Sequence, residues 1–96
     1  YPLPWGTGFA SWAEALEDAC GRIADYAPDI LLVSLGVDTF KGDPISKFRL
    51  ESEDFTTYGA RIARLGLPTL FVMEGGYAVE QIGVNTVNVL QGFAGR

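Results

Sequence analysis

Two segments of the 96-residue chain carry the side chains that are best placed to do chemistry, and each follows a run of apolar residues. The first, GVDTFKGDPISKF, contains Asp38, and the second, EGGYAV, contains Tyr77 behind Gly75 and Gly76. Paired glycines permit a tight turn and the close approach of a ligand to the backbone. A phenol beside such a turn can donate a hydrogen bond to an oxyanion that develops during a reaction. The alternative is that Tyr77 only caps or packs against the turn.

The acidic residues of these segments are candidates for a metal site or for loop structure. Asp38 can ligate a metal at the mouth of a crevice, or its carboxylate can bond the backbone of its own loop, as aspartates in turns often do. Asp43, within the sequence GDP, is expected to form a turn. Glu74 leaves an apolar run and is expected to brace backbone groups beneath the crevice. Ile45 either lines a wall of the site or anchors the long loop to the sheet.

The amino-acid composition excludes several kinds of active site. The chain contains no histidine, so it cannot assemble by itself a Ser-His-Asp or Cys-His catalytic site, or a metal site with histidine ligands. Its single cysteine, Cys20, excludes an internal disulfide, and the apolar helical surroundings predict a small core residue. One unpaired cysteine fits a reducing, cytoplasmic location.

Charge and hydropathy argue against nucleic-acid and membrane partners. Seven basic and twelve acidic residues give a net charge of −5, and no basic cluster is present that would follow a phosphate backbone. The sequence has no apolar stretch of about 18 residues, the length needed to span a membrane. We also expect no signal peptide, because no basic-then-apolar leader is found. Hydrophobic residues make up 48% of the chain, as in a packed globular domain.

The elements that position these side chains alternate between helix and strand. After a loop rich in proline and glycine, Ser11 and Glu14 form a capping box that predicts a helix over residues 12–26. The apolar runs DILLVSLG and TLFVM predict strands that are buried on both faces. Between them, Ser52 is expected to cap another helix. The last helix is predicted from an inner stripe of Val79, Ile82, Val87, Leu90 and Phe93.

The order α-β-α-β-α predicts an α/β fold with a parallel sheet. Ligands bind beyond the carboxyl ends of the strands in such sheets, so Asp38 and Tyr77 should open onto the same side, with Tyr77 at the entrance of the last helix. A pair of strands does not complete a sheet, because each strand keeps an open edge. We therefore expect the chain to be part of a larger domain, or to pair its edges with a second copy in a homo-oligomer.

These motifs, taken together and in order, resemble the C-terminal part of a zinc-dependent deacetylase of the histone deacetylase superfamily, and most closely its acetylpolyamine amidohydrolase branch. The resemblance is carried by the opening PLPWGTG and by SLGVDTF, DPIS and PTLFVMEGGYAVEQIG, along essentially the whole chain. It implies the parallel α/β sheet that the family shares with arginase. It also implies that residues 1–96 are the C-terminal segment of an enzyme that deacetylates acetylated polyamines or related acetyl-amines.

The resemblance also implies roles for individual residues. It makes Asp38 a zinc ligand and Tyr77 the residue that polarises the substrate carbonyl, and it places Ile45 beside the substrate channel. We expect Gly75 and Gly76 to contact the substrate as well. The family's Asp-x-His element and tandem histidines, which carry the other zinc ligands and acid-base catalysis, have no counterpart here. The isolated chain is therefore expected to hold no zinc and to be inactive.

Two other functions stay open from the sequence alone. The chain could be a separate binding or assembly module that keeps the elements of the fold without catalysis. The EGGY turn could instead bind a phosphate or a nucleotide, although it lacks the full G-x-G-x-x-G spacing of such turns.

Overall fold

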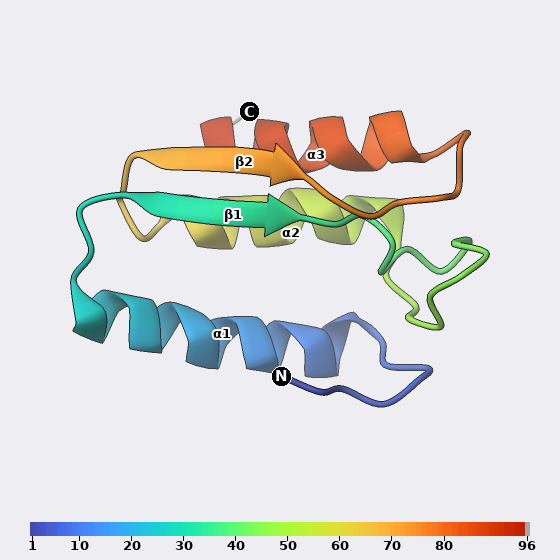
Figure 1. Ribbon diagram of the computed structural model, residues 1–96, viewed down its shortest axis with the longest axis horizontal. Coiled ribbons are helices and arrows are strands. Elements are labelled where there is room, and N and C mark those ends of the chain that lie inside the picture. The colour runs from blue at the N-terminus through green and yellow to red at the C-terminus, as the bar shows by residue number, and fades with distance from the viewer. Residues whose placement is uncertain (96) are drawn as a thin grey trace.

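A computed structural model describes residues 1–95 of the chain (Figure 1). Its elements follow the predicted order α-β-α-β-α and confirm the α/β class. They are α1 (Phe9–Tyr26), β1 (Leu31–Leu35), α2 (Ser52–Ala63), β2 (Thr69–Met73) and α3 (Ile82–Ala94). Within residues 1–95, each helix is too short or too polar to reach across a bilayer.

The strands form a parallel pair, in which Leu31 lies opposite Thr69 at the start of the register. Parallel neighbours need a crossover connection, and α2 lies on the segment that joins β1 to β2. Both strand arrows therefore point to the same end of the sheet in Figure 1. The segments that contain Asp38 and Tyr77 leave the strands at their carboxyl ends, on this one side of the sheet, as the sequence predicts.

One face of the sheet packs into the core, and the other face is open. The inward side chains join a cluster around α2 and are Leu31, Val33, Leu35 and Phe71. Their neighbours along the strands point outward: Leu32 is 62% exposed, Leu70 is 57% exposed and Val72 is 38% exposed. The prediction that the strands are buried on both faces is therefore wrong for residues 1–95, whose core cluster lies on one face of the sheet.

Helices α2 and α3 pack with their backbones in close contact. A Cβ atom on Gly92 would lie 2.0 Å from the carbonyl oxygen of Thr56, and a Cβ on Gly59 would lie 2.2 Å from that of Val89. Real Cβ atoms do not approach backbone oxygens so closely, so both positions require glycine. These glycines bring the helices together at a smaller separation than larger residues would allow.

The observed helix starts differ from the predicted caps. α1 begins at Phe9, so Ser11 lies inside the helix and the predicted capping box is wrong. α2 is capped one position earlier than predicted, by Glu51 in place of Ser52. The carboxylate of Asp54 accepts a hydrogen bond from the Glu51 N–H at 2.8 Å, and the Glu51 side chain accepts one from the Asp54 N–H. Two carboxylates at this helix start also complement its positive dipole end.

The buried face of α3 matches the predicted stripe only in part, since Ile82 and Phe93 pack against the core cluster. The helix starts at Ile82, so Val79 precedes it and is 79% exposed. Val87 and Leu90, which were expected to point inward, are 49% and 44% exposed. The buried residues of α3 are Asn85, Val89 and Gly92. The close contact at Gly92 selects this face, because only the smallest residue lets the α3 backbone reach α2.

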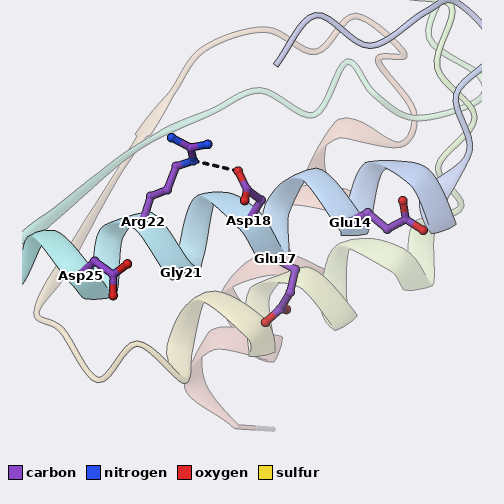
Figure 2. A pocket seen from close by; sticks show the side chains of 6 residues that line it. All are labelled: Glu14, Glu17, Asp18, Gly21, Arg22 and Asp25. Atoms are coloured by element: carbon purple, nitrogen blue, oxygen red, sulfur yellow. Dashed lines mark hydrogen bonds and ion pairs between the residues drawn. The ribbon is translucent and has the colours of Figure 1, made fainter.

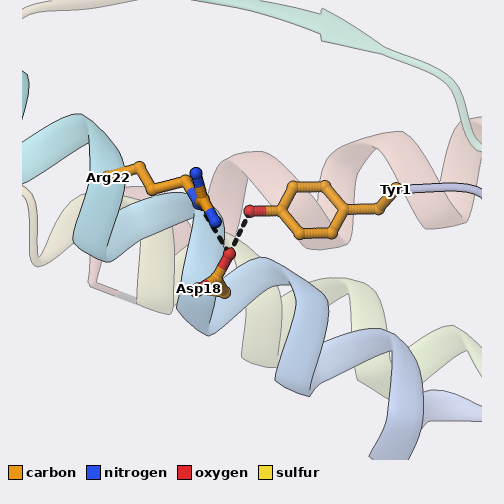
Figure 3. Close-up of polar contacts among 3 residues, drawn as sticks. All are labelled: Tyr1, Asp18 and Arg22. Atoms are coloured by element: carbon orange, nitrogen blue, oxygen red, sulfur yellow. Dashed lines mark hydrogen bonds and ion pairs between the residues drawn. The ribbon is translucent and has the colours of Figure 1, made fainter.

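The opening loop is tied to the middle of α1 (Figure 3). The Tyr1 hydroxyl and the Arg22 Nε–H both donate to Oδ2 of Asp18, the latter at 2.8 Å. These hydrogen bonds, the one from Tyr1 first, lower the pKa of the Asp18 carboxyl. All three side chains lie on the surface, so the tie orients the loop more than it stabilises the fold.

Candidate functional site

Backbone hydrogen bonds continue the pairing of the strands into the two motif segments. The Glu74 N–H donates to the Leu35 carbonyl at 2.8 Å, and the Val37 N–H donates to the Gly75 carbonyl at 2.8 Å. These bonds hold the residues that follow β1 and β2 side by side. We call the region formed by residues 36–45 and 74–78 the strand-end site.

Asp38 lies directly against the backbone of the second segment. A Cβ on Gly75 would lie 2.5 Å from Oδ2 of Asp38, and a Cβ on Gly36 would lie 2.8 Å from its Oδ1. Both neighbours must be glycine for the carboxylate to occupy this position. The loop N–H groups of Ile45 and Ser46 donate to another aspartate and not to Asp38. These two N–H groups are therefore not partners of Asp38, and its role as a metal ligand remains a prediction.

Gly76 is required for a different reason. Its φ of 147° lies in a region that side-chain-bearing residues rarely adopt, and a Cβ there would also lie 2.6 Å from Cγ2 of Val37. Together, Gly75 and Gly76 are explained by backbone geometry and by the packing of Asp38 and Val37. Their contact with a substrate remains a prediction.

Asp43 joins the two segments of the site. Its Oδ1 accepts hydrogen bonds from the N–H groups of Ile45 at 2.8 Å and Ser46 at 2.9 Å, which confirms the predicted turn. Its Oδ2 accepts a third, from the N–H of Tyr77 at 2.9 Å, which the sequence did not predict. Burial acts to raise the pKa of the Asp43 carboxyl, but the N–H groups of Ser46, Ile45 and Tyr77 together hold it below its ordinary value.

Tyr77 presents its side chain to solvent at the site, where it is 48% exposed. The prediction that it lies at the entrance of α3, near free N–H groups, is wrong because α3 begins only at Ile82. A turn fills the interval, in which the Gln81 N–H donates to the Ala78 carbonyl at 2.8 Å. The phenol is thus held by a loop and remains accessible to a ligand.

Two other predicted residues of the site are exposed. Ile45 is 66% exposed, so it does not anchor its loop to the sheet, and its place beside a substrate channel remains a prediction. Glu74 is exposed as well, and its contact with β1 is made by its backbone N–H. The prediction that the Glu74 carboxylate braces groups beneath the crevice is wrong, because this side chain is exposed.

Tyr58 of α2 is a neighbour of the site that the sequence reasoning missed. It is only 4% exposed, and its ring centroid lies 4.7 Å from that of Trp12 and 5.3 Å from that of Phe55. Burial first, and the negative charge of Asp38 second, raise the pKa of the Tyr58 phenol. The sequence pattern around Tyr58 signals core packing alone, since nothing local marks its nearness to Asp38.

The donors present fit one part of a metal site. Within residues 1–95, no group of three His, Cys, Asp or Glu side chains is placed to hold a metal ion. Catalytic zinc has three protein ligands and a water molecule. Asp38 fits as one carboxylate ligand of such a set, and further ligands would come from outside this chain.

An open depression along α1 is separate from the strand-end site (Figure 2). It is lined by Glu14, Glu17, Asp18, Gly21, Arg22 and Asp25. Two of its carboxylates are paired: Asp18 lies 2.8 Å from Arg22, and Glu17 lies 2.6 Å from Arg61 of α2. It contains no residue of either motif segment, and a solvated helix face accounts for its charges.

The sequence and the fold both match one known family. The family described as the histone deacetylase domain matches residues 1–93. This chain belongs to the histone deacetylase family. Its parallel α/β fold is of the arginase and deacetylase type, as the resemblance implies.

Within the histone deacetylase family, relatives named as acetylpolyamine amidohydrolases are similar along the chain. Acetylpolyamine amidohydrolase 1 of Pseudomonas aeruginosa is 68% identical over 95 residues, which are 99% of this chain and 28% of the relative. The enzyme of Mycoplana ramosa is 54% identical with the same coverage of 99% and 28%. A crystal structure of the acetylpolyamine aminohydrolase from Burkholderia pseudomallei has a TM-score of 0.93 and 36% identity, over 97% of this chain and 27% of that one. The chain thus spans about 28% of the length of these curated relatives.

Proposed function

We propose that residues 1–96 are the C-terminal segment of a zinc-dependent amidohydrolase that removes the acetyl group from acetylated polyamines or related acetyl-amines. One observation carries this proposal: Asp38 and the turn that leads to Tyr77 meet at one edge of the parallel sheet, with the Asp38 carboxylate against Gly75. The similarity to acetylpolyamine amidohydrolases, at 54% and 68% identity, supports the substrate class.

In this proposal Asp38 is one of the ligands of zinc, a metal that when bound activates water and polarises a carbonyl group as a Lewis acid. The Tyr77 hydroxyl donates a hydrogen bond to the oxyanion that develops on the acetyl carbonyl, and its exposure allows a substrate to reach it. Gly75 and Gly76 let the substrate approach the backbone. The exposed apolar side chain of Ile45 borders the substrate.

The remaining groups of the site would come from residues outside this chain. The sequence contains no histidine, so neither an imidazole ligand for zinc nor an imidazole general base is available within it. We therefore propose that the 96 residues by themselves neither retain zinc nor hydrolyse an acetyl amide.

The test compares Tyr77→Phe and Asp38→Ala in a complete deacetylase polypeptide that contains this chain, with the isolated chain as the inactive control. Tyr77→Phe should retain zinc and lower kcat by about 10²- to 10³-fold, because it removes one donor to the oxyanion. Asp38→Ala should lower the zinc content, measured by mass spectrometry after dialysis. A Tyr77→Phe enzyme with full kcat, or an Asp38→Ala enzyme with full zinc, would overturn the corresponding role.

A second candidate function is a non-catalytic binding or assembly module. The observation that favours it is the apolar outer face of the sheet, where Leu32 and Leu70 are 62% and 57% exposed. In a complete deacetylase domain, other parts of the polypeptide would cover this face. A gene that encodes only this chain, together with a defined and inactive oligomer, would favour the module.

A further inference from the structure

We propose that Asp43 is a positioning residue for Tyr77: its buried carboxylate fixes the backbone of Tyr77 and thereby the place of the phenol at the strand-end site. This inference rests on the proposed function, since Asp43 serves the reaction only if Tyr77 acts on the substrate. Asp43 itself has no contact with substrate or zinc in this proposal and acts through Tyr77.

Asp43 uses one carboxylate oxygen for its own loop and the other for Tyr77. Oδ1 accepts the N–H groups of Ile45 and Ser46 at 2.8 and 2.9 Å, and Oδ2 accepts the N–H of Tyr77 at 2.9 Å. Asp43 is 6% exposed, so water competes little for these bonds. Hydrogen bonds to a charged acceptor are roughly twice as strong as those between neutral groups. The bond to Tyr77 is therefore strong enough to hold a loop in place.

Tyr77 needs such an anchor because the backbone bonds that continue the strand pairing reach only the Gly75 carbonyl, which accepts from the Val37 N–H. Gly75 and Gly76 precede it, and glycine allows the backbone more conformations than any other residue. Helix α3 begins only at Ile82, so helical hydrogen bonds do not reach Tyr77 from the other side. Without a bond from another part of the chain, the half-exposed phenol would sample several positions at the site.

The loop that carries Asp43 is a firm support. Its ends are joined where Phe40 and Leu50 pair in an isolated parallel bridge, and both of these side chains are buried. The Asp43 N–H also donates to the Phe40 carbonyl at 3.0 Å. Because the same loop begins at Asp38, the bond that Asp43 accepts from the Tyr77 N–H sets the Tyr77 backbone relative to the proposed zinc ligand.

Asp43→Asn separates the two functions of the carboxylate. The amide oxygen of asparagine can still accept the N–H groups of Ile45 and Ser46, whereas its NH₂ group cannot accept the N–H of Tyr77. The experiment introduces Asp43→Asn into the complete deacetylase, alone and together with Tyr77→Phe. It measures kcat, KM, zinc content and the hydrogen-exchange rate of the Tyr77 amide. The matched control is Asp54→Asn, which alters a carboxylate that accepts the backbone N–H of Glu51 at the start of α2.

Asp43→Asn should lower kcat on the order of 10- to 100-fold with little change in KM or zinc, because a misplaced group loses transition-state contacts. The Tyr77 amide should exchange faster. In the Tyr77→Phe background the same substitution should change kcat by less than about twofold, since the hydroxyl that Asp43 positions is absent there. Asp54→Asn should leave kcat unchanged.

The outcomes separate this inference from the proposed function. Full activity of Tyr77→Phe would overturn the proposed function and this inference with it. An impaired Tyr77→Phe beside a fully active Asp43→Asn would overturn this inference alone. An equal loss of kcat from Asp43→Asn in both backgrounds, or a loss of zinc, would show a general structural role and would also overturn it. If Asp43→Asn does not fold, Asp43→Ser, which keeps a short acceptor for the turn, takes its place and is measured alone and together with Tyr77→Phe.

Discussion

Two aspartates of one loop are held in opposite ways, and the difference separates a candidate ligand from a structural acid. Asp38 lies against Gly36 and Gly75, where the missing side chains make room for its oxygens. Asp43 is 6% exposed and has both oxygens engaged by backbone N–H groups. A carboxylate with free oxygens can ligate a metal, whereas a carboxylate with engaged oxygens fixes the backbone that surrounds it.

The engaged state of Asp43 predicts how its contribution to stability depends on pH. Its pKa in the folded chain is below the ordinary aspartate value of about 3.9. The contribution is therefore present above that value and is lost as the pH falls through the folded pKa. Near neutral pH, Asp43→Asn should lower the free energy of unfolding by about 1–3 kcal/mol. Urea unfolding at neutral pH and at about pH 3 should show a smaller difference between wild type and variant in acid. A difference that stays constant would contradict this prediction.

At the scale of the elements, α2 and α3 depend on the absence of side chains at their contact. The atoms that a Cβ on Gly59 or Gly92 would meet are backbone atoms, which cannot rotate away as the end of a flexible side chain can. The helices would have to separate, and Phe55 and Val89, both fully buried, would lose contacts.

Gly92→Ala should therefore lower the free energy of unfolding by about 1–3 kcal/mol, as overpacking does in other cores. Gly21→Ala on α1 is the matched control, because a Cβ there meets no atom within 4 Å. The control should raise the free energy of unfolding by roughly 0.5–1 kcal/mol, since alanine favours the helix over glycine. Thermal and urea unfolding measure both variants. A Gly92→Ala chain as stable as Gly21→Ala would mean that the helices can move apart freely.

At the scale of the whole molecule, the chain leaves apolar surface and strand edges exposed. The outer sheet face exposes Leu32, Leu70 and Val72, and both strands keep an unpaired edge in the described part of the chain. Exposed apolar faces and open edges promote association. The curated relatives are longer, and this chain matches 28% of their length.

The purified 96-residue chain should therefore form dimers or larger assemblies at micromolar concentration. Replacing Leu70 and Val72 by lysine should shift the distribution towards monomer, because the charges would have to be buried at the contact. Val79→Lys, at a position that is 79% exposed and outside the sheet, is the control and should have little effect. Sedimentation velocity measures the distributions. A compact wild-type monomer would contradict the expectation.

The elements and the place of the site could be predicted from the sequence, because the patterns that indicate them are local. TLFVM coincides with β2, and DILLVSLG contains β1, since short apolar runs bounded by proline and glycine mark strands in any context. The parallel order followed from the alternation of helix and strand, and it brought Asp38 and Tyr77 to one edge.

The tertiary structure alone decided which surfaces meet. The sequence placed Val87 and Leu90 inside, yet they are 49% and 44% exposed, because the close contact of Gly92 with the α2 backbone sets which side of α3 faces α2. Likewise, the residues Gly42-Asp43-Pro44 predicted the turn at Asp43. The hydrogen bond that Asp43 accepts from Tyr77 was not predicted, because it joins residues 34 positions apart in the sequence. A short-range pattern records what a residue does to its own backbone. Which distant residue it contacts in the folded protein depends on how the chain between the two residues folds.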